Sequence, residues 1–391
     1  MWATLRGLPR PVWLLVAGTF VNRFGSFVLV FLVLYVKHLG YSTAAAGLAA
    51  SAYGAGGMAS SLLGGWLADR IGRRNAIALS MFSSAAAMLG LSQVRPLPAV
   101  VALSVAVGLT TELYRPASAA LMADLVAPAQ RVAAFGLWRF AINLGFAVGP
   151  LVGGLLAQRS FLLLFVGDAA TSGVFGVLAL ATLPQGRRAE THLEVRGEAV
   201  RTIARDRRFV LFLVATVLAA FAYVQSQTTF AVQVVDDGHS RAVYGALVAL
   251  NGLVIVLVEL PLISLTQRLR RVPVLAAGFA LEGIGFGLIP ISGTAAWLAV
   301  TVLVWTLGEM IFSPVAGAYV ADLSPEHLRG RYNGAWGLAW GVALVLGPSL
   351  GALVYSASHA ALWLVCLGCG LGAAALVLRS ERYVPVLAPR A

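Results

Sequence analysis

Two stretches of the sequence are similar at an offset of 198 positions: residues 114–154, YRPASAALMADLVAPAQRVAAFGLWRFAINLGFAVGPLVGG, and residues 312–352, FSPVAGAYVADLSPEHLRGRYNGAWGLAWGVALVLGPSLGA. The shared residues keep this one offset over the whole stretch. They pair Pro116 with Pro314, Ala123-Asp124-Leu125 with Ala321-Asp322-Leu323, Arg131 with Arg329, Gly136 with Gly334, Gly149-Pro150 with Gly347-Pro348, and Gly153 with Gly351. Arg70 and Arg268 keep the same spacing further upstream. The chain is therefore expected to consist of two similar halves.

The composition indicates that most of the surface faces lipid. Hydrophobic residues make up 59% of the 391 positions and charged residues 11%, against about 45–50% and about 25% in soluble chains. This excludes a soluble enzyme, a disordered chain, a secreted disulfide scaffold and a nucleic-acid binder. Cys366 and Cys369 lie in an apolar stretch without a neighbouring His, Asp or Glu. We interpret them as packing residues and predict neither a metal nor a cofactor.

Twelve apolar runs are long enough to cross a bilayer, which needs about 20 residues per helix. They cover 13–36, 44–68, 75–94, 97–123, 131–157, 160–183, 208–233, 243–266, 273–292, 296–322, 331–357 and 360–379. Together with the repeat they predict an all-α integral membrane protein of two pseudo-symmetric six-helix bundles. We expect an N-terminal bundle over 1–183, a cytoplasmic linker over 184–207, whose part from about 194 is either a short amphipathic helix or solvated chain, and a C-terminal bundle over 208–391. Repeats in the same orientation place a substrate site between bundles, near mid-depth.

The basic residues set the expected orientation. With the N-terminus inside, 21 of the 28 Lys and Arg residues fall in cytoplasmic segments and 4 in outer loops. This asymmetry predicts a multi-pass protein of the cytoplasmic membrane with both termini in the cytoplasm. The formal charge of +12 is then explained by membrane topology and not by binding to nucleic acid.

Three motifs resemble those of the major facilitator superfamily. GWLADRIGRR at 65–74 resembles the family's loop between helices 2 and 3, and the spaced glycines of 145–154 with Pro150 resemble the helix-5 motif of its antiporters. Asn22-Arg23-Phe24-Gly25 resembles a pattern in twelve-helix drug/proton antiporters. The resemblance covers the whole chain and implies the major facilitator fold. One departure is Ser104, where family members often carry an arginine, so the antiport mechanism transfers directly only if Arg115 replaces it.

The resemblance also implies a latch at the cytoplasmic side and a sliding contact along helix 5. The latch is expected to join the loop after the second helix to the ends of the fourth and fifth helices; its residues are Asp69, Arg70, Gly72, Arg73, Asp124 and Arg131. Charge that only orients the chain is the alternative. The stripe of Gly145, Gly149 and Gly153 lets a neighbouring helix approach closely, and Pro150 bends the helix. Ordinary packing of small residues is the alternative for the stripe.

Eight charged residues lie inside the predicted spans, where each costs about 2.5–3.5 kcal/mol. They are Arg23, Glu112, Arg115, Arg139, Asp168, Glu259, Glu282 and Glu309. We predict Glu112, with Arg115 and Arg139 at similar depth, as the proton-coupling acid and Glu309 as its near-symmetric partner. A structural ion pair is the alternative for Glu112, and a structural role is the alternative for Glu309. Asp168 and Glu282 fall on helices 6 and 9, which in this family usually lie outside the cavity, so structural hydrogen bonding is favoured for both.

Polar and aromatic residues of helices 1, 4, 7 and 10 suit an amphiphilic substrate. The predicted substrate-binding residues are Arg23, Asn22, Phe27, Phe31, Tyr114, Tyr223, Gln227 and Trp305. Packing or lipid contact is the alternative for the aromatic residues. For Arg23, which could hold an anionic substrate, neutralisation of an acid or structural pairing is the alternative. Five acids against three arginines favour cationic or zwitterionic substrates.

These features predict a proton-coupled secondary transporter that exports small amphiphilic compounds, such as drugs or metabolites, by alternating access. No GxxxxGK[ST] loop is present, and the protein is not expected to be an enzyme. Its expected partners are the substrate, protons and the lipid bilayer, and we expect a monomer. A proton symporter or facilitator for a metabolite or lipid is the first alternative. A non-transporting membrane receptor or assembly subunit is the second, although intramembrane charges argue against it.

Overall fold

The computed structural model describes residues 7–127, 130–186, 197–266, 269–325 and 328–383, and its regular structure there is helical. In the first half the helices are α2 (Arg10–Phe24), α3 (Phe27–His38), α4 (Thr43–Ile71), α5 (Arg73–Gln93), α6 (Leu97–Glu112), α7 (Tyr114–Leu125), α8 (Arg131–Arg159) and α9 (Phe161–Thr182). In the second half they are α10 (Gly197–Arg205), α11 (Arg207–Gln225), α12 (Thr229–Asp236), α13 (Arg241–Thr266), α14 (Arg271–Gly287), the short 3₁₀ helix η2 (Ile289–Ile291), α15 (Ala295–Leu323), α16 (Arg329–Ala357) and α17 (His359–Ser380).

Each of the twelve predicted runs falls on a helix or on a broken pair of helices, which confirms the predicted fold class. Within the described residues, eleven segments are long and apolar enough to cross a membrane. The predicted second span is α4, a helix of 29 residues that is roughly 40 Å long at about 1.5 Å per residue. Because it contains many Gly, Ala and Ser residues, it is not apolar enough to be among these eleven segments. It is nevertheless long enough to span a bilayer.

Two compact units are present. The first combines residues 1–192 with 238–256, and the second combines 193–237 with 257–391. The first part of α13 thus belongs to the first unit, where Gly245 packs against Pro150 and Gly154 of α8. Each unit has its own apolar core, around Tyr114 and Phe175 in the first and around Phe212 and Tyr319 in the second. The bundle limits predicted from the sequence stay a prediction.

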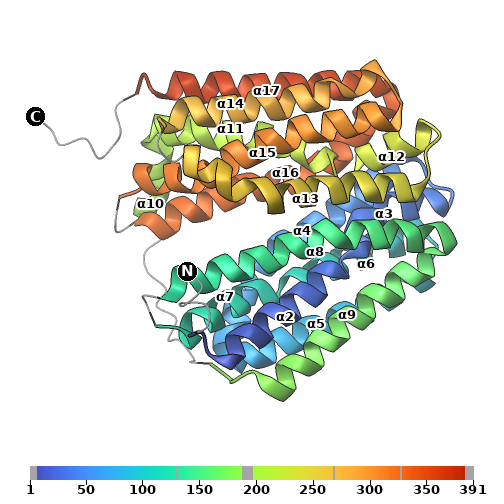
Figure 1. Cartoon of the computed structure of the whole chain (residues 1–391), viewed down its shortest axis with the longest axis vertical. Helices are drawn as coiled ribbons and strands as arrows, with labels where there is room; N and C mark the ends of the chain where they lie inside the picture. Colours follow the sequence, from blue (N-terminus) through green and yellow to red (C-terminus); the bar gives the residue numbers. More distant parts are fainter. Residues whose placement is uncertain (1–6, 128–129, 187–196, 267–268, 326–327, 384–391) are drawn as a thin grey trace, which may run out of the picture. The chain divides into compact units, whose positions relative to one another are not determined.

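Three of the predicted runs are each broken into two helices (Figure 1). The first run is split between α2 and α3, the fourth between α6 and α7, and the seventh between α11 and α12. The break at Leu113 lies three residues before Pro116, which has no N–H to bond the carbonyl of Glu112 and clashes with it in a regular helix. The other two breaks lack such a proline and depend on side chains, described below.

The linker predicted over 184–207 is described in part. Residues 187–196 lie outside the described residues, and the chain beyond them forms the helix α10. Asp206 then begins α11, because its side chain accepts a hydrogen bond from the N–H of Phe209 at 3.0 Å. Such a side chain satisfies one of the unpaired N–H groups at a helix start.

Candidate functional site

Ionisable side chains collect at the centres of membrane spans in both units. Glu309 is at the midpoint of its span, and Arg23, Glu112 and Glu282 each lie within one residue of theirs. Charges at this depth are rare because lipid does not solvate them, and where they occur they mark functional sites. Each unit therefore has a central polar site.

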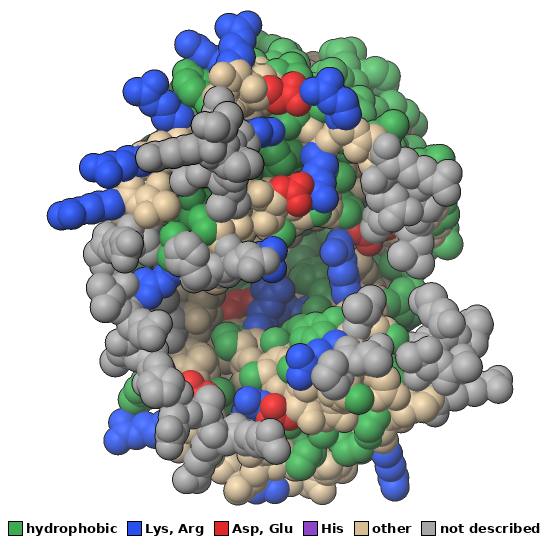
Figure 2. All heavy atoms as spheres, turned by 90° about the vertical axis from the view of Figure 1, so that its left-hand side faces the viewer, with side chains coloured by type: hydrophobic (Ala, Val, Ile, Leu, Met, Phe, Trp, Pro, Cys, Tyr) green, Lys and Arg blue, Asp and Glu red, His purple; other side chains and the backbone are tan. Residues whose placement is uncertain are grey.

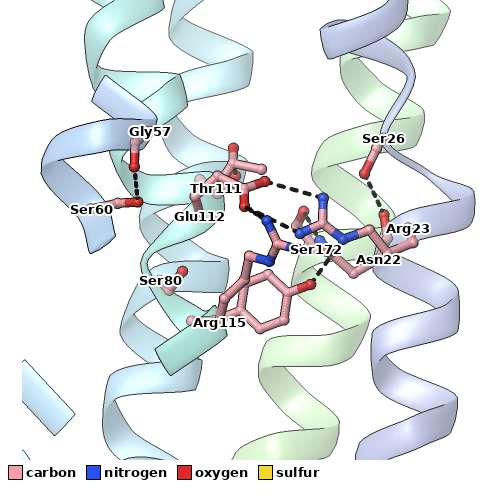
Figure 3. A network of polar contacts seen from close by, with 12 residues as sticks. Asn22, Arg23, Ser26, Gly57, Ser60, Ser80, Thr111, Glu112, Arg115 and Ser172 are labelled. Atoms are coloured by element: carbon pink, nitrogen blue, oxygen red, sulfur yellow. Dashed lines mark hydrogen bonds and ion pairs between the residues drawn. The ribbon is translucent and has the colours of Figure 1, made fainter. Parts of the chain in front are cut away.

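In the first unit, Glu112 lies between two arginines (Figure 3). The Nη1 and Nη2 atoms of Arg23 donate to its Oε1 and Oε2 at 3.1 and 3.4 Å, and Nη1 of Arg115 donates to Oε2 at 2.9 Å. The side chain of Arg23 is only 3% exposed, whereas that of Arg115 is 53% exposed. A bidentate arginine–carboxylate pair of this kind is among the strongest polar contacts in proteins. We call Arg23, Glu112 and Arg115 the ion-pair hub.

Tyr114 and α8 hold Arg23 in place. Nε of Arg23 donates to the Tyr114 hydroxyl at 3.0 Å, and its guanidinium carbon lies 5.7 Å from the ring centre of Phe146. Gly145 lies against the backbone of α2, since a Cβ added there would be 2.8 Å from the backbone nitrogen of Phe24. The helix-5 glycines thus allow α8 to pack directly on the end of α2, next to the hub.

An acid from another helix accepts a backbone hydrogen bond at the break between α2 and α3. Asp168 of α9 accepts a hydrogen bond from the N–H of Val28 at 3.1 Å and is 1% exposed. A carboxylate at a helix start is favoured by the unpaired N–H groups and the helix dipole. The break leaves Arg23 near the end of α2, so Asp168 indirectly sets the position of the hub.

In the second unit the central site contains two acids, Glu282 and Glu309, and the tyrosine Tyr223. The Tyr223 hydroxyl hydrogen-bonds both Glu309 and Gln227, and it also interacts electrostatically with Glu282. Glu309, Tyr223 and Gln227 are partly exposed, whereas Glu282 is buried. Gln225 closes the break between α11 and α12: its Oε1 accepts from the hydroxyl of Thr229 at 2.8 Å.

Most of the predicted substrate-binding residues are packed inside their unit. Phe27, Phe31, Tyr114 and Trp305 are at most 3% exposed. The amide of Asn22 donates to Ser172 at 3.2 Å, and Arg23 is engaged in the hub. Tyr223 and Gln227 are the members of the set that keep partly exposed surface.

The other predicted residues lie at the basic helix ends and along α8. Arg73 forms an ion pair with Asp124 and donates to the carbonyl of Ala120. Gly72 links α4 to α5 with φ of +88°, a value that favours glycine. Asp69 is partly exposed, and Arg70 lies over the Trp66 ring. Arg131 and Arg139 are exposed on α8. Many Lys and Arg side chains project from the face that Figure 2 displays.

The second unit repeats the contacts of Arg73. Arg271 pairs with Asp322 and donates to the carbonyl of Ala318, and all three residues lie 198 positions after their counterparts. The loop over 267–271 lacks the acid and the glycine of the loop over 69–73, which predicts an asymmetric latch. The structure shows that the ion pair itself is present in both units.

The model of the family described as "Major Facilitator Superfamily" matches residues 15–238 and 227–391. The chain belongs to this superfamily. It is therefore a multi-pass membrane transporter and not an enzyme, as the three motifs predicted.

Relatives within the superfamily differ in what they are named for. The chain is 26% identical to the uncharacterized MFS-type transporter YqjV of Bacillus subtilis over 355 residues, 87% of this chain and 85% of the relative. It is 25% identical to a Na(+), Li(+), K(+)/H(+) antiporter of Planococcus maritimus, covering 74% and 77%. It is 26% identical to the multidrug resistance protein MdtH of Klebsiella pneumoniae, covering 72% and 71%.

Solved structures support the fold. A peptide transporter POT in complex with sulfate superimposes with a TM-score of 0.81 at 20% identity, covering 96% of this chain and 94% of the other. The nucleoside transporter NupG gives 0.81 at 15% identity, covering 95% and 99%. At such identities the likeness concerns the fold alone.

Sequence reasoning did not find the pair between Arg23 and Glu112, nor Tyr53. The Tyr53 hydroxyl is buried without a hydrogen-bond partner among the described residues and interacts electrostatically with Arg23 and Glu112. A single tyrosine in a helix of small residues could have indicated a polar neighbour. The pairing itself joins residues 89 positions apart and has no signature in the sequence.

Proposed function

We propose that the protein is a proton-coupled secondary transporter that exports small amphiphilic compounds, with cationic or zwitterionic ones favoured. The observation that carries the proposal is the layer of ionisable side chains at the midpoints of spans in both units. A transporter driven by a proton gradient needs membrane-buried groups that change protonation or charge pairing during the cycle. The relatives named as a cation/proton antiporter and a multidrug resistance protein support antiport.

The predicted residues take distinct roles in this proposal. Glu309 exchanges protons, and Tyr223 and Gln227, which are partly exposed next to it, contact the substrate. Glu112 takes part in proton coupling through the ion-pair hub. Its partner Arg115 is exposed to solvent, and Arg139 is a further basic group on α8. Arg73 and Asp124, with Asp69, Arg70, Gly72 and Arg131, hold the cytoplasmic helix ends. We place the monomeric protein in the cytoplasmic membrane with both termini inside.

The test is flux in reconstituted vesicles across an imposed pH gradient, with ethidium and tetraphenylphosphonium as cationic amphiphilic probes. We expect the wild-type protein to move at least one probe against its concentration gradient, and dissipating the pH gradient to stop this movement. Glu309→Gln, which keeps the size of the side chain, should abolish the uphill flux. If neither probe moves uphill when the pH gradient is imposed in either direction, the proposal is wrong.

A further inference from the structure

Glu282 of α14 is a buried acid without a hydrogen-bond partner. It is 1% exposed, and neither of its carboxyl oxygens has a partner among the described residues. Two neighbouring helices approach its backbone closely. A Cβ added at Gly308 of α15 would lie 3.0 Å from the Cα of Glu282, and one added at Gly283 would lie 2.8 Å from the Cα of Gly370 in α17. The side chain is thus enclosed where three helices meet.

Among the described residues, the groups that interact electrostatically with Glu282 do not include a cation. They are Glu309 of α15, Tyr223 of α11 and the thiols of Cys366 and Cys369 of α17. Each of these groups is neutral or negative. None of the four can neutralise a carboxylate as Arg23 and Arg115 neutralise Glu112.

The first unit supports the placement of Glu282 beside Glu309. At the offset of 198, Glu282 corresponds to Ser84 and Glu309 to Thr111. The hydroxyls of Ser84 and Thr111 are buried and lie 2.9 Å apart, joining α5 to α6. The same two positions that form a neutral hydroxyl pair in the first unit therefore carry two carboxyl groups in the second.

Two ionised carboxylates are not stable in such a place. A buried carboxylate without a donor or a counter-ion is strongly disfavoured because it has lost its hydration, and a second carboxylate nearby adds repulsion. The acid that is more deeply buried and lacks donors keeps the proton, whereas Glu309 has Tyr223 as a donor and partly exposed surface. The two acids thus share one negative charge.

We propose that Glu282 is the residue that stores the coupling proton, and that Glu309 is the acid through which this proton exchanges with water. In the transfer step the O–H bond of Glu282 breaks and its electron pair stays on the Glu282 oxygen. The proton binds a carboxylate oxygen of Glu309 and passes from there to water, while the cationic substrate next to Tyr223 and Gln227 neutralises the negative charge that the two acids gain. This assignment rests on the proposed function, because a proton store matters only in a proton-coupled cycle.

Infrared spectroscopy of the purified protein in lipid vesicles tests the assignment without a substrate. A protonated carboxyl group has a C=O band that a carboxylate lacks. At neutral pH we expect wild-type protein to show such a band, Glu282→Gln to lose the part that one carboxyl group contributes, and Glu112→Gln, the matched control with the same change, to keep it. A full band in Glu282→Gln would show that Glu282 is ionised and would overturn the assignment.

A second variant keeps the test decisive if Glu282→Gln does not fold. Glu309→Gln is expected to retain the band, since the proton resides on Glu282. If Glu309→Gln loses the band, Glu309 holds the proton and the assignment is wrong. Failure of the proposed function is seen separately, as absence of pH-driven flux in the wild-type protein, which does not affect the band.

Discussion

The central sites of the two units differ although the units repeat each other in sequence. In the first unit two arginines surround one acid, Glu112. In the second unit two acids, Glu282 and Glu309, interact with each other and with Tyr223. The offset pairs each ionisable residue with a neutral one: Arg23 with Phe221, Glu112 with Met310, Arg115 with Ser313, Glu282 with Ser84 and Glu309 with Thr111.

The helix ends, in contrast, are repeated faithfully. The pairs Arg73–Asp124 and Arg271–Asp322 are equivalent, including the bonds to Ala120 and Ala318. The repeat thus preserves the contacts that tie helices together at their ends, while the centres have diverged into a fixed ion-pair hub and a pair of acids. We infer that the two units do different work in one transport cycle.

The largest expected effect concerns the hub. Glu112→Gln removes the carboxylate that neutralises Arg23, whose charge then stays buried and unpaired. Breaking a buried ion pair in this way typically costs about 3–5 kcal/mol, so we expect a clear drop in the Tm of the purified protein. Thermal unfolding in detergent measures it.

The matched control for this comparison is Glu282→Gln. It replaces a neutral carboxyl group by a neutral amide of similar size, so its Tm should stay near that of the wild type. Equal losses of Tm in Glu112→Gln and Glu282→Gln would remove the distinction between a charged hub and a protonated acid.

A smaller effect is expected at the break in the first span. Asp168→Ala removes the carboxyl group that accepts from the N–H of Val28, and loss of such a helix-start contact costs about 1 kcal/mol. The measurement is again Tm, and backbone hydrogen exchange at Phe27 and Val28 should increase. Unchanged exchange there would mean that packing of α8, not Asp168, holds the break.

The smallest effects are expected at the repeated ion pairs. Asp124→Asn should lower Tm more than Asp322→Asn, because Arg73 is 10% exposed and Arg271 is 40% exposed. Pairs near water contribute about 0–1 kcal/mol, so the second variant should fall close to the wild type, most of all at high salt. A larger loss in Asp322→Asn would show that the two ends are not equivalent after all.

The sequence predicted the twelve spans, their order and the repeat because bilayer thickness fixes helix length and hydropathy is a property of each segment alone. It also predicted which positions are charged at mid-depth. The resemblance of the motif at 65–74 also implied that Arg73 and Asp124 belong to one cluster at the cytoplasmic helix ends.

The tertiary structure alone decided what each central charge contacts. The sequence leaves open whether Arg23 binds substrate or pairs with an acid, and in the structure α8 and the break after Phe24 direct it to Glu112, 89 residues away. Its place on helix 9 favours structural hydrogen bonding for Glu282, but neither of its oxygens has a partner among the described residues. The reason is physical: the energy of a buried charge depends on the groups that surround it in space, and those groups come from helices that the local sequence does not specify.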